Sequence, residues 1–417
     1  MSATLSPGRR SSFFHTAAIA GAALLGLCVL PAAADWPRYL GPTQNGVAAE
    51  GAWAGRIPDG TPRTIWKASV GKGTAGIVAA NGRVYSMGNE AEKDTIYCFD
   101  AKTGQVIWKH AFSLALDPNM FEGGPRSTPT LDENRIYTVS HYGDLWCLDA
   151  ATGKKIWNLH YKEWGGRRPE WGFAGSPTVA GNLLLCDVGG VGASTVALDK
   201  KTGKVVWKSG DHKPGYASPV VTELEGKPTV LVFKAEHLVG YDLASGKELW
   251  SIGWKTSYDV NAAAPLPMGD DRILISSGYS TGCALIQVRG GKATELWRNK
   301  NLRAQINTPV PMGNHVYGID GNTGGGNLVC LDVNTGERNW IEKSVKGGSL
   351  IRASDKLFVL TEKGELVIAD ASPAGFKEHL RTQVLKARCW VQPTLSDGRL
   401  FLRDNEGNVV CLDFGAS

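Results

Sequence analysis

The sequence predicts an all-β fold: an eight-bladed β-propeller of four-stranded antiparallel blades, with the ring closed by N- and C-terminal strands. Three observations predict it. An Asp-x-x-Thr/Ser-Gly turn recurs along the chain, a Trp follows most of these Asp residues eight positions later, and the two ends of the chain carry complementary parts of one repeat. A chain of 417 residues is also too long for one ordinary core unless a unit is repeated.

Each complete repeat reads as a β-hairpin. The apolar residues before the Asp form a strand, the Asp carboxylate can accept backbone N–H bonds across the turn, and Gly supplies a positive φ. The residues after Gly alternate and finish on Trp, which indicates the returning strand. Five complete copies are CFDAKTGQVIW (98–108), CLDAATGKKIW (147–157), ALDKKTGKVVW (197–207), GYDLASGKELW (240–250) and CLDVNTGERNW (330–340).

The spacing of the repeats predicts the number of blades. The Asp positions are 38 to 50 residues apart, which is typical of four-stranded propeller blades. Two copies are degenerate, because Arg289 takes the Asp position of blade five and Glu378 replaces the Trp of blade seven. The eight Asp positions are 100, 149, 199, 242, 289, 332, 370 and 413.

The two ends of the chain complete one blade between them. Residues 62–71 form a lone strand with Trp66, and residues 393–413 supply three strands that end without a Trp strand. Closure by both termini removes the exposed edges of an open array. We therefore expect a signal peptide at 1–34, an N-terminal extension at 35–61 and a single propeller at 62–417.

The N-terminus has the pattern of a secretion signal. Arg9 and Arg10 precede an apolar run at 17–30, and small residues end at Ala34, before Asp35. We expect export to the periplasm or the extracellular space, with cleavage near Ala34. The paired arginines leave the general secretory and the twin-arginine route open. No other run is long and apolar enough to span a membrane.

Charge and cysteine content exclude several function classes. Without the two N-terminal arginines the chain carries 43 − 40 = +3 and has no lysine/arginine cluster, which argues against nucleic acid. Four cysteines occupy one position in four repeats, as small buried hydrophobes would. The sequence contains no Cys-x-x-Cys motif, and the spacing of its histidines does not indicate a metal site. These cysteines are Cys98, Cys147, Cys330 and Cys411.

The Ala/Cys-x-Asp-x-x-Thr-Gly-x-x-x-Trp pattern resembles the pyrroloquinoline-quinone (PQQ) propeller repeat, over residues 62–414. Quinoprotein alcohol dehydrogenases use this ring to hold PQQ and Ca²⁺, and BamB-like proteins use it without cofactor as a scaffold in outer-membrane protein assembly. WPRYLGPTQNG, GPRSTPT and SSGYSTGCAL are most similar to uncharacterised secreted bacterial members. The resemblance implies that the repeat tryptophans dock on the neighbouring blade and are structural: Trp66, Trp108, Trp157, Trp207, Trp250, Trp297 and Trp340.

The residues that the resemblance requires for catalysis find no match in this chain. The dehydrogenases clamp the quinone between a Trp and often a disulfide of adjacent cysteines, and they hold Ca²⁺ with Glu, Asn and Asp. This chain has no Cys-Cys pair, and no matching motif supplies the trio. We therefore expect no catalytic residues, no metal and no cofactor. PQQ with Ca²⁺ remains the alternative, with its binding residues unknown.

Departures from the repeat mark the candidate ligand or partner rim, because blade loops form the usual binding surface. Loops 112–127, 160–175 and 276–285 are the main departures, and they form a single site only if the first two share one face of the ring. The alternatives without a binding role are that Arg126 pairs with a nearby acid, that Trp171 packs under a blade, and that the other arginines are solvated. The candidate residues are Glu122, Arg126, Trp164, Arg167, Arg168, Glu170, Trp171 and Tyr279.

These observations favour a secreted, non-catalytic PQQ-like propeller, a monomer that acts as a binding or scaffold protein in the cell envelope. Trp and Arg close together are typical of recognition surfaces, so a protein partner or a glycan is expected at the rim. Two alternatives stay open. One is a PQQ-dependent oxidoreductase of alcohols or sugars, and the other is a protein that binds a carbohydrate or another small molecule.

Overall fold

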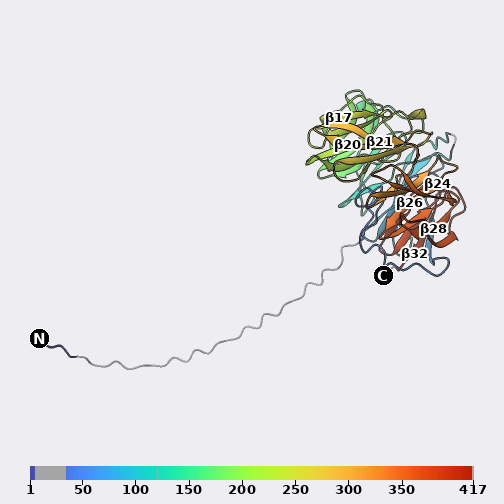
Figure 1. Ribbon diagram of the computed structural model, residues 1–417, viewed down its shortest axis with the longest axis horizontal. Helices are drawn as coiled ribbons and strands as arrows, with labels where there is room; N and C mark the ends of the chain where they lie inside the picture. Colours follow the sequence, from blue (N-terminus) through green and yellow to red (C-terminus); the bar gives the residue numbers. More distant parts are fainter. Residues whose placement is uncertain (5–33, 120, 416–417) are drawn as a thin grey trace. The chain divides into compact units, whose positions relative to one another are not determined.

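The predicted eight-bladed propeller is confirmed. The structure, a computed structural model, describes residues 1–4, 34–119 and 121–415. Its strands form eight four-stranded antiparallel sheets (Figure 1), and Ala33–Ser417 is one compact unit. The predicted signal sequence, with its paired arginines and apolar run, lies outside the described residues except for its two ends.

Each blade uses four consecutive strands, except the last. Blades one and two are β2 (Val78–Ala80), β3 (Arg83–Glu90), β4 (Lys93–Asp100), β5 (Val106–Ser113), and β6 (Thr130–Asp132), β7 (Arg135–Val139), β8 (Asp144–Asp149), β9 (Lys155–His160). Blades three and four are β10 (Thr178–Ala180), β11 (Leu183–Gly190), β12 (Ala193–Asp199), β13 (Val205–Ser209), and β14 (Val220–Leu224), β15 (Lys227–Phe233), β16 (His237–Asp242), β17 (Glu248–Gly253). Blades five and six are β18 (Leu266–Pro267), β19 (Arg272–Ser277), β20 (Gly282–Arg289), β21 (Lys292–Asn299), and β22 (Val310–Met312), β23 (His315–Asp320), β24 (Asn327–Asp332), β25 (Arg338–Lys346). Blade seven is β26 (Ser349–Ala353), β27 (Lys356–Leu360), β28 (Glu365–Asp370), β29 (Glu378–Gln383), and two short 3₁₀ turns are η1 (Tyr161–Trp164) and η2 (Ser257–Asp259).

Blade eight closes the ring with strands from both ends of the chain. β30 (Thr394–Ser396), β31 (Arg399–Arg403) and β32 (Asn408–Asp413) come from the C-terminal end, and β1 (Thr64–Ser69) pairs with β32 as the outer strand. Trp66 lies beside Cys411 in this ladder, in the register that the other blades use for Trp and Cys. Because β1 completes blade eight, every blade has an outer strand and the ring is closed, as the sequence predicted.

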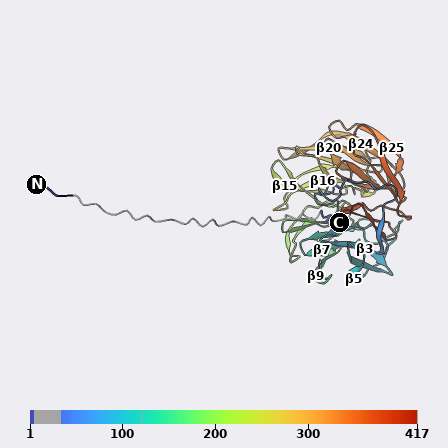
Figure 2. The same ribbon diagram turned by 90° about the horizontal axis from the view of Figure 1, so that it is seen from below.

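The first strand of every blade lies nearest the ring axis. β2 contacts β6 and β30, β6 contacts β10, and β22 contacts β26. Figure 2 shows the sheets following one another around the ring, from β3 and β7 through β15 to β20 and β24. We call the face where the first strands begin the upper face. The turns between first and second strands, and between third and fourth strands, therefore lie at the lower face.

The repeated Thr-Gly turn and the repeated Trp together form the joint between blades. Trp108 Nε1 donates a hydrogen bond to the Ala150 carbonyl of the next blade at 3.0 Å. Gly153, in the turn of that blade, has φ of +71° and lies directly against the Trp108 ring. Gly is therefore required twice, for its backbone conformation and for the close approach of the ring. Four more joints use the same bond: Trp66 to Ala101, Trp207 to Leu243, Trp297 to Val333 and Trp340 to Ser372.

Replacing Gly153 with alanine is expected to cost more stability than replacing a glycine with the same backbone but open surroundings. A Cβ on Gly153 would lie 2.6 Å from the Trp108 ring, whereas Gly226 has φ of +70° and nothing within 4 Å. Both substitutions strain the backbone, so their difference isolates the ring contact, about 1–3 kcal/mol. Urea unfolding of Gly153→Ala and Gly226→Ala measures it, and equal losses would contradict the joint.

All eight blades carry a β-bulge one residue before the Trp position. In blade one Cys98 faces Trp108 and Phe99 faces Val106, so Ile107 is extruded from the ladder. A bulge twists the free edge of the outer strand and protects it from pairing with another strand. The eight bulged residues are Ile65, Ile107, Ile156, Val206, Leu249, Leu296, Asn339 and His379.

The register corrects the two degenerate positions. In blade five Arg272 pairs with Gln287, as Arg83 pairs with Asp100 in blade one, so Gln287 and not Arg289 holds the Asp position. The strands there run on to a two-glycine hairpin and displace Arg289 from the turn. In blade seven Leu380 and not Glu378 holds the Trp position, because the preceding turn is two residues longer.

Buried cysteines and a buried arginine complete the core. All seven cysteines of the described residues are free and buried, so the predicted role of the periodic cysteines as small hydrophobes is confirmed. Arg403 of blade eight is fully buried and reaches blade one, where Nη1 donates to the carbonyls of Ala75 and Met87 and Nη2 to that of Gly73. Burial lowers the pKa of Arg403 to about 10. Its guanidinium ties the last blade to the first.

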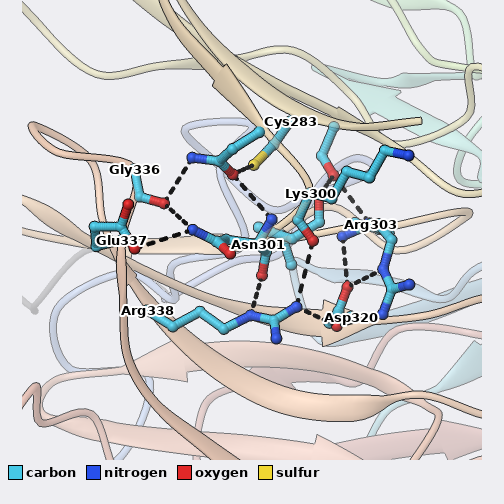
Figure 3. Close-up of polar contacts among 12 residues, drawn as sticks. Cys283, Lys300, Asn301, Arg303, Asp320, Gly336, Glu337 and Arg338 are labelled. Atoms are coloured by element: carbon cyan, nitrogen blue, oxygen red, sulfur yellow. Dashed lines mark hydrogen bonds and ion pairs between the residues drawn. The ribbon is translucent and has the colours of Figure 1, made fainter. Parts of the chain in front are cut away.

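An ionic cluster fixes the connection between blades five and six (Figure 3). The carboxylate of Asp320 is almost fully buried and accepts two hydrogen bonds from Arg303, both at 2.8 Å. Arg338 Nη2 donates to the same carboxylate at 2.5 Å, and its Nε donates to the Asn301 carbonyl. The connection after the degenerate blade five therefore has its own polar anchor.

The N-terminal segment closes the channel at the lower face. Trp36 pairs with Ala79 of β2 through two backbone bonds, and the Pro37 carbonyl accepts from Leu131 N of β6. Farther along, Gln44 Nε2 donates to the Pro219 carbonyl before β14, and Ala48 N donates to the Arg352 carbonyl of β26, so the segment crosses the channel and reaches blades four and seven. Residues 36–48 of the predicted extension are therefore packed into the propeller, and they form the floor of its central cavity.

Candidate ligand cavity at the channel mouth

The central channel contains a cavity of about 200 Å³ above this floor. Trp36, Tyr39 and Leu40 form the bottom. The wall consists mainly of residues that precede the first strands of blades one to six and blade eight, so the cavity opens toward the upper face. Four wall residues stand immediately before the proline that introduces a first strand: Thr128, Ser176, Ser218 and Gln392.

Four of the eight predicted site residues line this cavity: Glu122, Arg126, Trp171 and Tyr279. The loops 112–127 and 160–175 therefore share one face, which is the condition for a single site. The Nδ2 of Asn119 also donates to the Glu170 carbonyl and links the two loops directly. Trp164, Arg167, Arg168 and Glu170 are not among the lining residues.

An aromatic arc follows one side of the cavity mouth. We use the name for Trp171, Tyr216, Tyr258 and Tyr279. The Trp171 ring lies 6.1 Å from Tyr216 and 6.1 Å from Tyr258, and Tyr258 meets Tyr279 edge-to-face at 5.4 Å. Gln305 Nε2 donates to the Tyr279 hydroxyl at 2.9 Å and fixes that ring. Such edge-to-face pairs form a rigid apolar surface with polar tips.

Tyr258 is the exposed member of the arc. Its side chain is 65% exposed, and its φ is +61°, a conformation that a bulky residue rarely adopts. Strained and exposed residues of this kind gather at functional sites. Tyr258 lies in η2, whose sequence carries no glycine and no repeat signature, so sequence reasoning did not single it out.

A second aromatic group flanks the cavity on the side of blade eight. Phe121 meets Trp390 edge-to-face at 4.7 Å, and the Arg388 guanidinium lies 5.3 Å from the Trp390 ring centroid. Trp390 Nε1 donates to the Glu362 carboxylate at 2.5 Å. The contact between Phe121 and Trp390 joins loops that are more than 250 residues apart in the chain, which explains why sequence spacing could not reveal it.

The cavity has one acidic and one basic lining side chain. Glu122 Oε1 accepts from Arg388 at 3.0 Å, and Oε2 accepts from Asn405 Nδ2 at 3.2 Å. Arg126 Nη1 donates to the Gly124 carbonyl at 3.2 Å, and burial lowers the pKa of its guanidinium. No ion pair of the described residues includes Arg126, so the alternative that pairs it with an acid is wrong. The Glu122 carboxylate is therefore paired with Arg388, whereas the Arg126 guanidinium keeps free donors.

Arg167 and Arg168 anchor their loop and do not face the cavity. Arg167 donates to the carbonyls of Gly189 and Asp211. Arg168 Nε donates to the His141 carbonyl at 3.1 Å, and its guanidinium pairs with Asp117. Backbone carbonyls and the Asp117 carboxylate occupy donors of both guanidinium groups, so the alternative of freely solvated arginines is wrong, and their part in a recognition surface stays a prediction.

The two remaining predicted residues also lie away from the cavity. Trp164 packs against the core between blades two and three, near Tyr161. The Glu170 side chain is exposed, and only its backbone carbonyl takes part in the link to Asn119. The missed cavity residues include Trp36, Tyr216 and Trp390. Tyr216 was accessible to sequence reasoning, since it stands three residues before the Pro that introduces β14.

A buried acid and histidine lie behind the wall near Arg126. Asp94 and His141 are fully buried, with Asp94 Oδ2 at 3.9 Å from His141 Nδ1. Asn89 Nδ2 donates to Asp94 Oδ1 at 2.7 Å. Burial raises the pKa of Asp94 to about 7 and lowers the pKa of His141 to about 4. Between about pH 4 and pH 7 both side chains are therefore neutral, although a free aspartate is charged through most of this range and a free histidine is charged below about pH 6.5.

The cavity residues do not fit the Ca²⁺ and PQQ pair that the sequence resemblance implies as an alternative. Ca²⁺ takes six to eight oxygen ligands, with several carboxylates among them. The cavity offers one carboxylate, Glu122, which Arg388 and Asn405 already occupy, and Arg126 adds a positive charge nearby. Ca²⁺ is therefore disfavoured there, because Arg126 already carries a positive charge and because too few carboxylates are available as ligands. Within the described residues, no cluster of three His, Cys, Asp or Glu could hold a metal ion.

Comparisons with known proteins agree with the architecture. BamB from Moranella endobia is 23% identical over 296 residues, 67% of this chain and 72% of that protein. The crystal structure of BamB from Moraxella catarrhalis superposes with a TM-score of 0.63 at 16% identity, over 85% of this chain and all of that one. The quinoprotein alcohol dehydrogenase PedH of Pseudomonas putida is 33% identical over 168 residues, but these are 38% of this chain and 27% of that enzyme.

Among the residues that the structure describes, none lies in a helix with the length and apolar character needed to cross a membrane. The family model described as outer membrane protein assembly factor BamB matches residues 55–116 and 92–342. These ranges cover well over half of the chain and most of the blades. The chain therefore belongs to the BamB-like family of PQQ-repeat propellers.

Proposed function

We propose that this protein is exported to the cell envelope and acts there as a non-catalytic scaffold that binds a partner protein at the mouth of its central cavity. The observation that carries the proposal is the aromatic arc. Trp171, Tyr258 and Tyr279 present adjoining ring surfaces at the open end of a closed-bottom cavity. Tyr and Trp in such a setting are the residues that dominate binding energy in protein interfaces.

The polar groups of the cavity support binding more than chemistry. General acid–base catalysis needs a titratable group within reach of the ligand. Glu122 is held by Arg388 and Asn405, and the buried Asp94 and His141 lie behind the wall. Membership of the assembly-factor family favours the same reading. An apolar or aromatic side chain from the partner would enter the cavity, with Arg126 free to donate hydrogen bonds to a polar group beside it.

Binding of a carbohydrate or another small molecule is the second candidate, and one observation favours it. Hydroxyl and amide side chains ring the cavity between its aromatic surfaces, an arrangement that suits a polar ring-shaped ligand. A floor of Trp36 and Tyr39 would stack such a ligand from below. This candidate uses the same cavity, so ligand titration separates it from partner binding.

Truncation of the exposed rings is expected to weaken capture of the partner. Tagged full-length protein, incubated with an envelope extract, should retain one predominant protein, and Tyr258→Ala and Trp171→Ala should lower its retention by about tenfold or more. Leu296→Ala is the matched control, because Leu296 is 52% exposed on the outer strand β21, away from the cavity. Unchanged retention by both ring variants would contradict the proposal.

Calorimetric titration distinguishes the alternatives. Titration with PQQ in the presence of Ca²⁺ is expected to give no saturable heat, because the cavity lacks the carboxylates for the cation. Saturable binding at micromolar concentration, lost in Trp171→Ala, would support the oxidoreductase alternative. Saturable binding of neutral sugars would instead support the second candidate.

A further inference from the structure

Three basic segments lie on the perimeter of three consecutive blades. Together we call them the basic rim, which consists of the outer strands β5, β9 and β13 with their preceding turns, residues 100–109, 149–158 and 199–208. It holds eight lysines and three aspartates, 8 − 3 = +5. The equivalent segments of blades four to seven, 242–251, 287–298, 332–341 and 370–381, carry −1, +2, −1 and 0. The charge is therefore gathered on one side of the ring.

Most of this charge is available to solvent. Seven of the eight lysines are exposed, and Lys200 is buried in an ion pair with Asp132 at 2.5 Å. The three aspartates accept hydrogen bonds from their own turns, which lowers the pKa of each carboxyl. The exposed lysines are Lys102, Lys109, Lys154, Lys155, Lys201, Lys204 and Lys208.

Branched aliphatic side chains lie between the lysines. Val106, Ile107, Ile156, Val205 and Val206 are each 40–52% exposed. Three of them, Ile107, Ile156 and Val206, are the bulged residues, which the ladder pushes outward. The bulge also obstructs addition of a partner strand at this edge. The basic rim is thus a surface of alternating lysines and aliphatics that is poorly suited to strand pairing.

The N-terminal segment places the basic rim relative to the rest of the chain. The turns of the rim lie at the lower face, and the segment that leads into the propeller begins there too. Ala34 N donates to Asp397, and Asn81 N donates to Asp35, both in turns between first and second strands. Residues 34 and 35 therefore enter the propeller at its lower face, whereas the cavity opens at the upper face.

We propose that the basic rim, on the perimeter of blades one to three, rests on the surface of an anionic lipid bilayer, so that the mouth of the cavity on the upper face stays clear of the membrane. Lysines extend their aliphatic stems along apolar surface and place their ammonium groups at lipid phosphates. The exposed Val and Ile side chains enter the boundary between head groups and acyl chains. A protein partner fits less well, because lysine is depleted in protein interfaces and the bulges obstruct strand addition.

Vesicle flotation tests this directly with the full chain. Vesicles of phosphatidylcholine with and without phosphatidylglycerol separate attraction to anionic lipid from attraction to any bilayer. The test variant carries Lys154→Glu, Lys155→Glu, Lys204→Glu and Lys208→Glu. The control variant has the same change of charge at exposed lysines of other blades, Lys247→Glu, Lys292→Glu, Lys343→Glu and Lys346→Glu.

The rim variant is expected to bind phosphatidylglycerol vesicles at least 100-fold more weakly, since each lysine near an anionic surface contributes about fivefold to the partition coefficient. The control variant should lose less than tenfold. Equal losses in the two variants, or equal binding of the wild type to both lipids, would overturn the proposal. The proposal would also be overturned if the rim variant no longer captured an envelope protein but still bound vesicles as well as the wild type.

A second variant keeps the proposal testable if the charge reversals disturb folding. Ile107→Ser with Val206→Ser changes two exposed side chains and leaves every charge in place. Binding of this variant at high salt, where lysine attraction is screened, should fall about tenfold below that of the wild type. Unchanged binding would show that the aliphatics do not enter the bilayer and would contradict that part of the proposal.

Discussion

Replacing Arg403 with methionine is expected to lower the free energy of unfolding by about 3–5 kcal/mol, the largest stability effect we expect from a single substitution. The guanidinium is the donor for the carbonyls of Ala75, Gly73 and Met87, all in blade one. Methionine fills most of the volume and donates nothing. Each buried carbonyl left without a donor costs about 1–3 kcal/mol, partly offset because a buried charge is removed.

Urea unfolding measures this loss, with Arg56→Met as control because the Arg56 side chain is exposed. Arg403→Lys should fall between the wild type and the methionine variant, since a single ammonium cannot reach all the carbonyls. A methionine variant as stable as the control would show that the tie between the last and first blades contributes little to closure. An unchanged slope with a lower midpoint would confirm a loss of stability in the native ring.

The second large effect depends on pH. Replacing Asp94 with asparagine is expected to raise stability at pH 8 much more than at pH 5. Burial raises the pKa of Asp94 in the folded state to about 7, above its usual 3.8. The protein therefore loses stability through this carboxyl as pH rises from about 4 to about 7, by roughly 1.4 kcal/mol for each pH unit within that window. Asparagine removes the titration and can still accept the bond from Asn89.

The wild type should lose about 2–3 kcal/mol relative to Asp94→Asn between pH 5 and pH 7. His141 acts in the opposite direction, because its lowered pKa means that stability falls as pH drops from about 6.5 to about 4. That contribution is common to both proteins and cancels in the comparison. Asp59→Asn, at an exposed carboxyl, is the control. Parallel stability profiles for wild type and Asp94→Asn would contradict a raised pKa at this site.

The repeat made the fold predictable because each of its residues has a local and periodic task. The Asp closes its own turn, the Gly admits the Trp ring of the preceding blade, and the Trp bonds to the next blade. Spacing alone failed only where turn length changed, at Arg289 and Glu378. There the strand register, which depends on the partner strand, decides which residue holds the position.

The cavity was only partly predictable because its wall is assembled from residues far apart in the chain. Glu122, Arg126, Trp171 and Tyr279 stood out as departures from the repeat. Arg168 has the same appearance in the sequence, but the carbonyl and the carboxylate that occupy its donors come from other segments. Nothing in the composition of residues 36–48 showed that they would cross the channel and form a floor. Such long-range placements are visible only in the folded ring.

Site-specific photo-crosslinking in cells tests partner binding at the cavity most directly. Benzoylphenylalanine at position 258 projects from the cavity mouth, and the same group at position 296 projects from the outer strand of blade five. Partner binding at the mouth predicts one predominant protein adduct at position 258 that is absent at position 296. An absence of protein adducts at position 258, or the same adducts at both positions, would contradict it.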